Sequence, residues 1–159
     1  MNTNMNAYRE IINEFMVSCF YSILEEEQQA LETITNGKLT IKEIHLIEAV
    51  FRTQKTGTNT FTNIASILRV ALGTLTKAFI KLQSKGFLTK ERDKTDKRIF
   101  YILPTKLAGI INDKHIEWHE KLMDSVIRNI PERDIENFID AIKNLSETFK
   151  KKTLYENKS

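Results

Sequence analysis

The middle of this chain constrains its fold more than any other part, because the hydrophobic period changes partway along it. Apolar residues first recur at spacings of three and four, in a short stretch at 61–68 and a longer one at 72–85. That spacing predicts two helices joined by a short turn. Two runs rich in aromatic and β-branched residues follow at 87–89 and 99–103, with a charged segment between them. They predict a β-hairpin with a charged tip, and a helix-turn-helix followed directly by such a hairpin is a winged helix.

Long helical patterns flank this middle segment. One apolar stripe predicts a helix at 6–34, and similar patterns predict helices that begin at Thr40, span 105–129 and begin at Pro131. Thr40 is followed three residues later by Glu43, which is the sequence of a capping box. The fold expected is therefore mainly α (α+β), as one domain over 1–159.

Composition excludes several classes of protein. The single cysteine, Cys19, excludes an intramolecular disulfide framework. No apolar run approaches the length of a membrane span, and the first ten residues lack the pattern of a signal peptide. We therefore expect a soluble, cytoplasmic protein with no membrane partner.

The charge is unevenly distributed along the chain. Residues 60–106 hold ten basic and three acidic residues, a balance of +7, so the rest of a chain with a total of +3 carries −4. A basic segment between mildly acidic flanks is typical of a protein that binds a polyanion.

The longer helix of the helix-turn-helix has the composition of a recognition helix. Its inner face is apolar, whereas its outer face carries small, hydroxyl-bearing and basic residues that suit a DNA major groove. The hairpin tip suits the phosphate backbone or a narrow minor groove, and Asp96 is placed to orient the Arg98 guanidinium. The predicted DNA contacts are Gly73, Thr74, Thr76, Lys77 and Lys81 on the helix, with Lys94, Asp96, Lys97 and Arg98 on the hairpin.

Several stretches resemble the MarR family of winged-helix transcriptional regulators. They include Gly73-Thr74-Leu75-Thr76-Lys77, the helix exit Leu82-Gln83-Ser84-Lys85-Gly86, and Asp96-Lys97-Arg98 on the hairpin. The resemblance implies a homodimer that represses transcription from a palindromic DNA operator. It assigns DNA binding to 38–104 and dimerisation to the helices at 1–37 and 105–159.

Within that family, three stretches look most like the branch that represses bacterial fatty-acid synthesis genes: TIKEIHLIEAV, LGTLTKAF and DKHIEWHEKL. That branch implies a long-chain acyl group on acyl carrier protein as corepressor, and no required cofactor. Two residues at the recognition helix differ from the usual family pattern. Ala71 replaces the usual Ser or Thr N-cap, and Ile80 stands where a polar residue is usual, so it either faces differently or touches DNA through an apolar contact.

An apolar effector pocket is a further hypothesis, since ligand sites between helices are mostly apolar. The same residues also suit ordinary core packing, and the sequence leaves both roles open. The candidates are Phe15, Met16, Phe20, Ile47, Phe51, Ile111 and Trp118.

The histidines suggest an alternative effector, zinc. His115 and His119 are four residues apart on one predicted helix, which aims two imidazoles at one point. His45 and Glu25, from the acidic end of the first helix, complete the candidate set. The resemblance supports both interpretations, because a zinc-sensing branch has such histidines and the fatty-acid branch uses similar ones as polar framework.

We do not expect an enzyme. The chain has no glycine-rich phosphate loop, Cys19 lies on an apolar stripe, and the His119-Glu120 pair lacks the spacing of a hydrolytic zinc motif. A helical protein-interaction module without DNA binding is the alternative from another class, although it leaves the basic hairpin unexplained.

Overall fold

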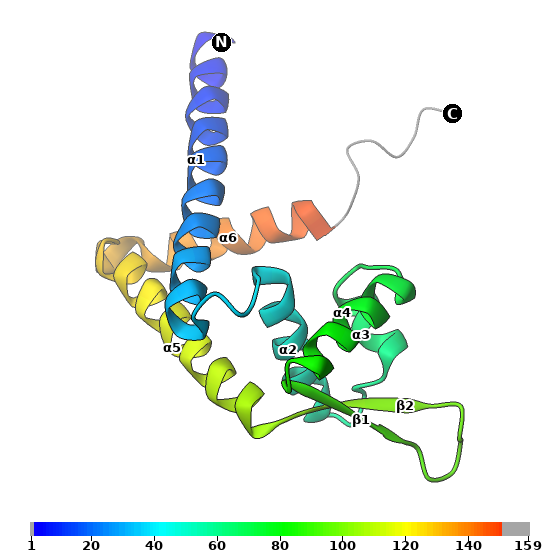
Figure 1. Ribbon diagram of the computed structural model, residues 1–159. Coiled ribbons are helices and arrows are strands. Elements are labelled where there is room, and N and C mark those ends of the chain that lie inside the picture. Colours follow the sequence, from blue (N-terminus) through cyan, green and yellow to red (C-terminus); the bar gives the residue numbers. More distant parts are fainter. Residues whose placement is uncertain (1, 151–159) are drawn as a thin grey trace, which may run out of the picture. The chain divides into compact units, whose positions relative to one another are not determined.

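The computed structural model describes the backbone of residues 2–150 and the side chains of residues 4–148. The chain divides into two compact units between Glu117 and Trp118. In chain order the elements are α1 (Asn2–Thr35), α2 (Ile41–Gln54), α3 (Phe61–Ile67), α4 (Leu72–Ser84), β1 (Leu88–Arg92), β2 (Phe100–Pro104), α5 (Lys106–Arg128), the 3-10 helix η1 (Glu132–Asp134) and α6 (Ile135–Lys150) (Figure 1).

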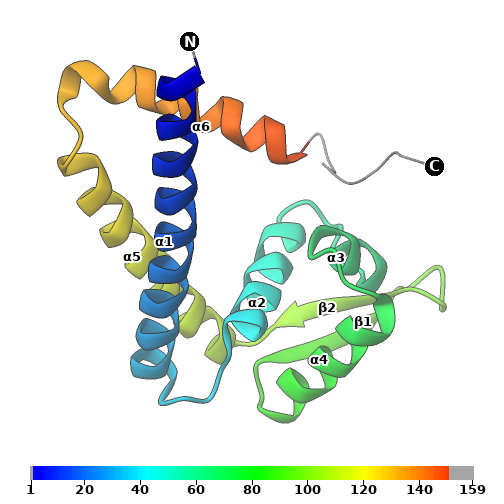
Figure 2. The same cartoon turned by 90° about the horizontal axis from the view of Figure 1, so that it is seen from above.

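The first unit holds a winged helix, which confirms the predicted mainly α fold class. Figure 1 and Figure 2 both show α2, α3, α4 and the hairpin gathered together, with the loop between β1 and β2 projecting outward. One hydrophobic core joins them, and it also receives Leu31 from α1 and Ala108 from α5. The core residues Ile44, Ile64 and Phe79 are almost completely buried. This shared core fixes α4 and the hairpin relative to each other.

The helix ends follow the sequence signals. Thr40 caps α2, and its side chain and that of Glu43 make both hydrogen bonds of a capping box. Thr60 caps α3 by accepting a hydrogen bond from the Asn63 N–H. Ala71 precedes α4 without a side-chain cap, as its chemistry requires. Gly86 ends that helix region with φ +80°, a conformation that disfavours other residues.

The two strands pair antiparallel, from Leu88 opposite Pro104 to Arg92 opposite Phe100. The turn before α3 adds a partial third strand: the Asn59 carbonyl accepts from the Ile102 N–H at 2.9 Å, and its Nδ2 donates to the Ile102 carbonyl at 2.8 Å. An isolated bridge joins Thr60 to Tyr101. Asn59 is only 4% exposed, so this anchor of the hairpin is part of the interior.

The second unit begins within α5, and a non-helical link at 129–131 leads to η1 and α6. Pro131, predicted as the first residue of the last helix, precedes instead the short η1 turn, and α6 begins at Ile135. A 3-10 turn is a common entry to an α-helix. No single helix in the described part of the chain is long and apolar enough to cross a membrane, and the bent pair α3–α4 meets the criterion by length and composition only.

Candidate DNA-binding surface and buried histidine cluster

Helix α4 has one buried face and one face open to solvent. Leu75, Phe79 and Leu82 are at most 1% exposed and hold the helix on the core. All five predicted contacts of this helix are exposed, namely Gly73, Thr74, Thr76, Lys77 and Lys81. The helix therefore presents the residue types that the sequence predicted for DNA.

Glu43 connects the start of α2 to the end of α4. Its Oε1 lies 2.9 Å from Lys85 Nζ and 3.1 Å from Lys81 Nζ, and the Glu43 side chain is only 6% exposed. Burial alone raises the pKa of Glu43, but hydrogen bonds from Lys85, from the Thr40 backbone and from Lys81 outweigh it and hold the pKa below its ordinary value. Lys81, one of the predicted DNA contacts, is thus already paired with Glu43.

The wing tip, residues 93–99, is ordered by its own carboxylates. Asp93 Oδ1 accepts from the backbone N–H groups of Thr95 and Asp96 at 2.8 and 2.7 Å, and Tyr101 donates its hydroxyl hydrogen to Asp93 Oδ2. The two backbone hydrogen bonds, that from Asp96 first, lower the pKa of Asp93. The tip is therefore a shaped loop.

Asp96 orients Arg98 as the sequence predicted. Its Oδ1 accepts from Arg98 Nε at 3.2 Å and from the Arg98 backbone N–H at 2.9 Å, while Oδ2 accepts from Nη2 at 3.3 Å. These bonds, the side-chain one first, lower the pKa of Asp96. The Arg98 side chain is nevertheless 90% exposed. An exposed guanidinium with a fixed plane is suited to a narrow groove or a phosphate.

The recognition helix and the hairpin border a common hollow of about 370 Å³. Leu72 and Thr76 line it from α4, and Arg98 and Phe100 line it from the hairpin. Lys90 and Arg92 stack over the Phe100 ring, with their cationic atoms 5.1 and 5.4 Å from its centroid. Helix and hairpin therefore border one hollow, and both elements carry exposed cations.

A second polar site, the histidine cluster (Glu27, His45, Glu48 and His115), lies where α1, α2 and α5 meet, with His45 and Glu48 partly exposed. Glu27 Oε1 lies 2.9 Å from His45 Nε2 and 3.2 Å from His115 Nε2. The other ring nitrogen of His115, Nδ1, lies 2.7 Å from Glu48 Oε1. The His115 side chain is completely buried and that of Glu27 is 5% exposed.

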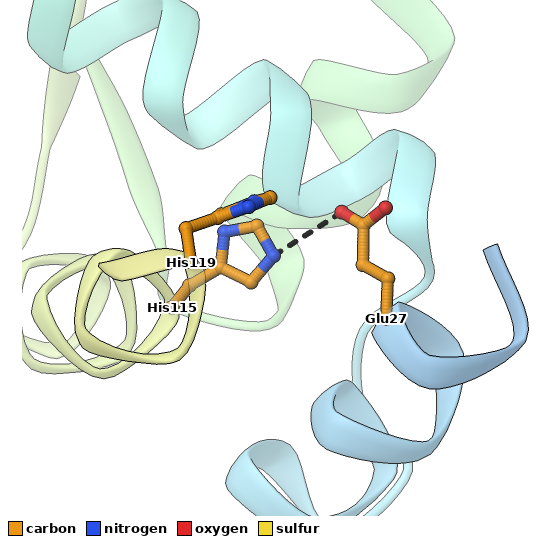
Figure 3. Close-up of side chains that lie close together, drawn as sticks. All are labelled: Glu27, His115 and His119. Atoms are coloured by element: carbon orange, nitrogen blue, oxygen red, sulfur yellow. Dashed lines mark hydrogen bonds and ion pairs between the residues drawn. The ribbon is translucent and has the colours of Figure 1, made fainter. Parts of the chain in front are cut away.

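The cluster agrees with part of the predicted metal set. His45 and His115 are brought together around one carboxylate, but it belongs to Glu27, whereas Glu25 is exposed. His119 follows one turn after His115 on α5, and Figure 3 shows it beside the hydrogen-bonded pair Glu27 and His115. Sequence reasoning missed Glu27 and Glu48, although the spacing of Glu27 from the buried Leu31 places both on one helix face.

Comparison with known proteins identifies the family. The family model for the transcriptional regulators SarA/Rot matches residues 29–114, more than half of the chain. The chain belongs to the SarA/Rot family of transcriptional regulators. No curated protein sequence matches it significantly.

Solved structures place this SarA/Rot family member among MarR-type winged-helix proteins. FabT from Streptococcus pneumoniae, solved in complex with DNA, is 25% identical, with a TM-score of 0.81 over 90% of this chain and 98% of that chain. The MepR–DNA complex from S. aureus is 17% identical, with a TM-score of 0.65 over 93% and 99%. A MarR family transcription regulator, SP03579, is 9% identical with a TM-score of 0.78 over 94% and 95%. The protein is a DNA-binding transcriptional regulator of the MarR type.

The seven residues that were predicted to line an apolar effector pocket lie in different surroundings. Ile47 and Ile111 belong to the core, whereas Phe15 and Phe20 are each 61% exposed on α1. Met16 is half-buried on α1, and Trp118 lies in the second unit.

A hollow of about 630 Å³ between α2 and α5 is lined by Phe51 but by none of the other six predicted residues. Polar groups such as His45, Arg52 and Asn112 make up much of its lining.

Proposed function

We propose that this protein is a homodimeric repressor that binds a palindromic DNA operator. The observation that carries the proposal is the shared surface of α4 and the hairpin, on which Asp96 holds an exposed Arg98 beside the outward face of the recognition helix. The contacts proposed are those predicted from the sequence, with Lys81 sharing its charge between Glu43 and a phosphate. A two-fold symmetric dimer presents two copies of this surface, so a palindrome is the natural target.

The exposed apolar stripe of α1 supports the homodimer. Ile11, Phe15 and Phe20 are 61–63% exposed, and Ile142 and Leu145 of α6 are 48% and 42% exposed. Large exposed apolar surfaces on terminal helices are typical of an interface between subunits. Sedimentation analysis tests this: we expect a dimer at micromolar concentration, and a monomer that binds operator with full affinity contradicts it.

We propose fatty-acid synthesis genes as the regulated set, with long-chain acyl carrier protein as corepressor. The stretches that resemble the fatty-acid branch, and the similarity to FabT over nearly all of both chains, support this choice. A mobility-shift titration of an operator with and without long-chain acyl carrier protein is the test, with unacylated carrier protein as the control. Tighter binding with the acylated form is expected, and unchanged affinity overturns the corepressor proposal.

A zinc-responsive regulator is the second candidate, favoured by the histidine cluster. Imidazole nitrogens and carboxylate oxygens are usual zinc ligands, and Glu27, His45 and His115 already converge on one point. His119 is the candidate fourth ligand by its place on α5. When bound, zinc would supply a cross-link between α1, α2 and α5.

Metal titration separates the two candidates. Zinc-responsive regulation predicts tight binding of one zinc ion per chain, its loss in Glu27→Gln and its retention in the matched control Glu25→Gln. Operator binding should change on addition of EDTA. Weak zinc affinity together with operator binding that EDTA leaves unchanged excludes the metal function.

A further inference from the structure

We propose that Ile80 recognises thymine methyl groups, so that the preferred DNA carries a thymine beneath this residue in each half-site. The inference rests on the proposed operator binding by α4 and goes beyond it by naming a residue that determines sequence preference. Thymine is the base that presents an apolar group, its C5-methyl, in the major groove.

Position 80 lies on the outward side of the recognition helix. Successive residues of an α-helix are rotated by about 100° about its axis. The buried residues Leu75, Phe79 and Leu82 mark the inner face, so the outer face can be identified from the sequence. The line opposite contains Gly73, Lys77, Ile80 and Ser84. All four are exposed, and Ile80 is 57% exposed despite its size.

The surroundings of Ile80 favour DNA as the molecule that covers it. Lys77 precedes it by nearly one turn and Lys81 is its neighbour, while Arg98 and the other wing cations continue the same surface. A protein partner with an apolar face would bury these cations without compensation. A polyanion that carries methyl groups within its groove satisfies both the cations and the isoleucine.

Thr76 extends the apolar character of the surface toward the hairpin. Its hydroxyl donates to the Leu72 carbonyl at 2.9 Å, so the hydrogen that would pair with a base acceptor is already used. Leu72 itself is 49% exposed and lines the hollow shared with Arg98. This side of the helix therefore offers methyl groups where many recognition helices offer donors, which makes apolar contact a large part of its sequence preference.

The experiment removes the methyl group from the DNA. Duplexes selected by the wild-type protein from a random pool are resynthesised with deoxyuridine at each thymine, which deletes only the C5-methyl. We expect one thymine per half-site at which the substitution weakens wild-type binding about fourfold, the ratio that corresponds to burying one methyl group. Ile80→Val should keep this sensitivity and Ile80→Ala should lose it.

The outcomes separate this inference from the proposed function. Full wild-type affinity for a duplex in which deoxyuridine replaces every thymine overturns the role of Ile80 while operator binding stands. Equal sensitivity of wild type and Ile80→Ala assigns the methyl contact to another residue and also overturns it. Failure of the wild-type protein to select any sequence refutes the proposed operator binding itself.

Discussion

The wing tip and the histidine cluster both use a carboxylate to orient nitrogen-bearing side chains, but in opposite surroundings. Asp96 holds Arg98 from two residues away, and the guanidinium remains 90% exposed. Glu27 holds His45 and His115 from 18 and 88 residues away, and His115 is completely buried. The exposed pair contributes little to folding and is available to a ligand. The buried set joins three helices, and the fold depends on its being complete.

The largest effect is expected from breaking the buried set. Glu27→Ala removes the acceptor shared by two imidazoles and leaves them partly buried without it, which should cost about 2–4 kcal/mol of unfolding free energy. Urea denaturation measures it. Glu25→Ala, two residues away on the same helix but exposed, is the matched control and should change stability by less than about 0.5 kcal/mol. Equal losses in both variants would contradict the structural role of the cluster.

Breaking the exposed pair should affect binding and spare the fold. Arg98→Ala is expected to weaken operator binding about tenfold at physiological salt, because a fixed, charge-assisted contact is lost. Arg133→Ala removes another exposed arginine beside an aspartate, one that belongs to the second unit. It should leave affinity unchanged, and the thermal unfolding temperature should be the same in both variants. Full affinity in Arg98→Ala would refute the wing assignment.

Glu43 combines features of both regions, because a buried carboxylate pairs with the lysines Lys81 and Lys85. Its contribution to stability should depend on pH. Its folded-state pKa is lowered, so its stabilisation is complete above the ordinary value of 4.5 and disappears as the pH falls through the lowered folded value. Glu43→Gln keeps a capping-box side chain but loses the charge, and should cost about 1 kcal/mol at pH 7. Urea denaturation at decreasing pH should show the wild-type and variant stabilities converging. A difference that persists unchanged below the folded-state pKa would show that the ion pairs with Lys81 and Lys85 are not its source.

The smallest effect distinguishes two lysines of the recognition helix. Lys77→Ala should reduce the slope of log affinity against log salt by about one, the effect of one lost phosphate contact. Lys81 is paired with Glu43, so Lys81→Ala should reduce the slope by less. Binding titrations between 50 and 300 mM salt, roughly the range in which phosphate contacts dominate, measure both. A larger change in Lys81→Ala would mean that the pair opens fully on DNA.

The features predicted from the sequence are those that depend on neighbouring residues. The capping box of Thr40 and Glu43 and the Asp96–Arg98 pair each join residues at most three positions apart, so their spacing alone predicts their geometry. The change from a helical to a strand period predicted the winged helix for the same reason. Each of these is confirmed by the structure.

The features that were missed depend on contacts between distant segments. Periodicity placed an acidic run at the end of the first helix, but only the packing of α2 and α5 shows that Glu27, rather than Glu25, faces the histidines. Asn59 reaches Ile102 across 43 residues, a pairing that no local signal reveals. Apolar periodicity alone also does not distinguish a core residue such as Ile47 from an exposed one such as Phe15.

The anchoring of the hairpin through Asn59 has a consequence for how such a protein diversifies. The attachment lies at Ile102 in the middle of β2, while the loop before that strand is shaped by its own aspartates. Length and composition of that loop can therefore drift through insertion, deletion or exchange between paralogues without disturbing the interior. An engineer who grafts a foreign loop between Arg92 and Phe100 inherits the same freedom, provided that the asparagine is left in place.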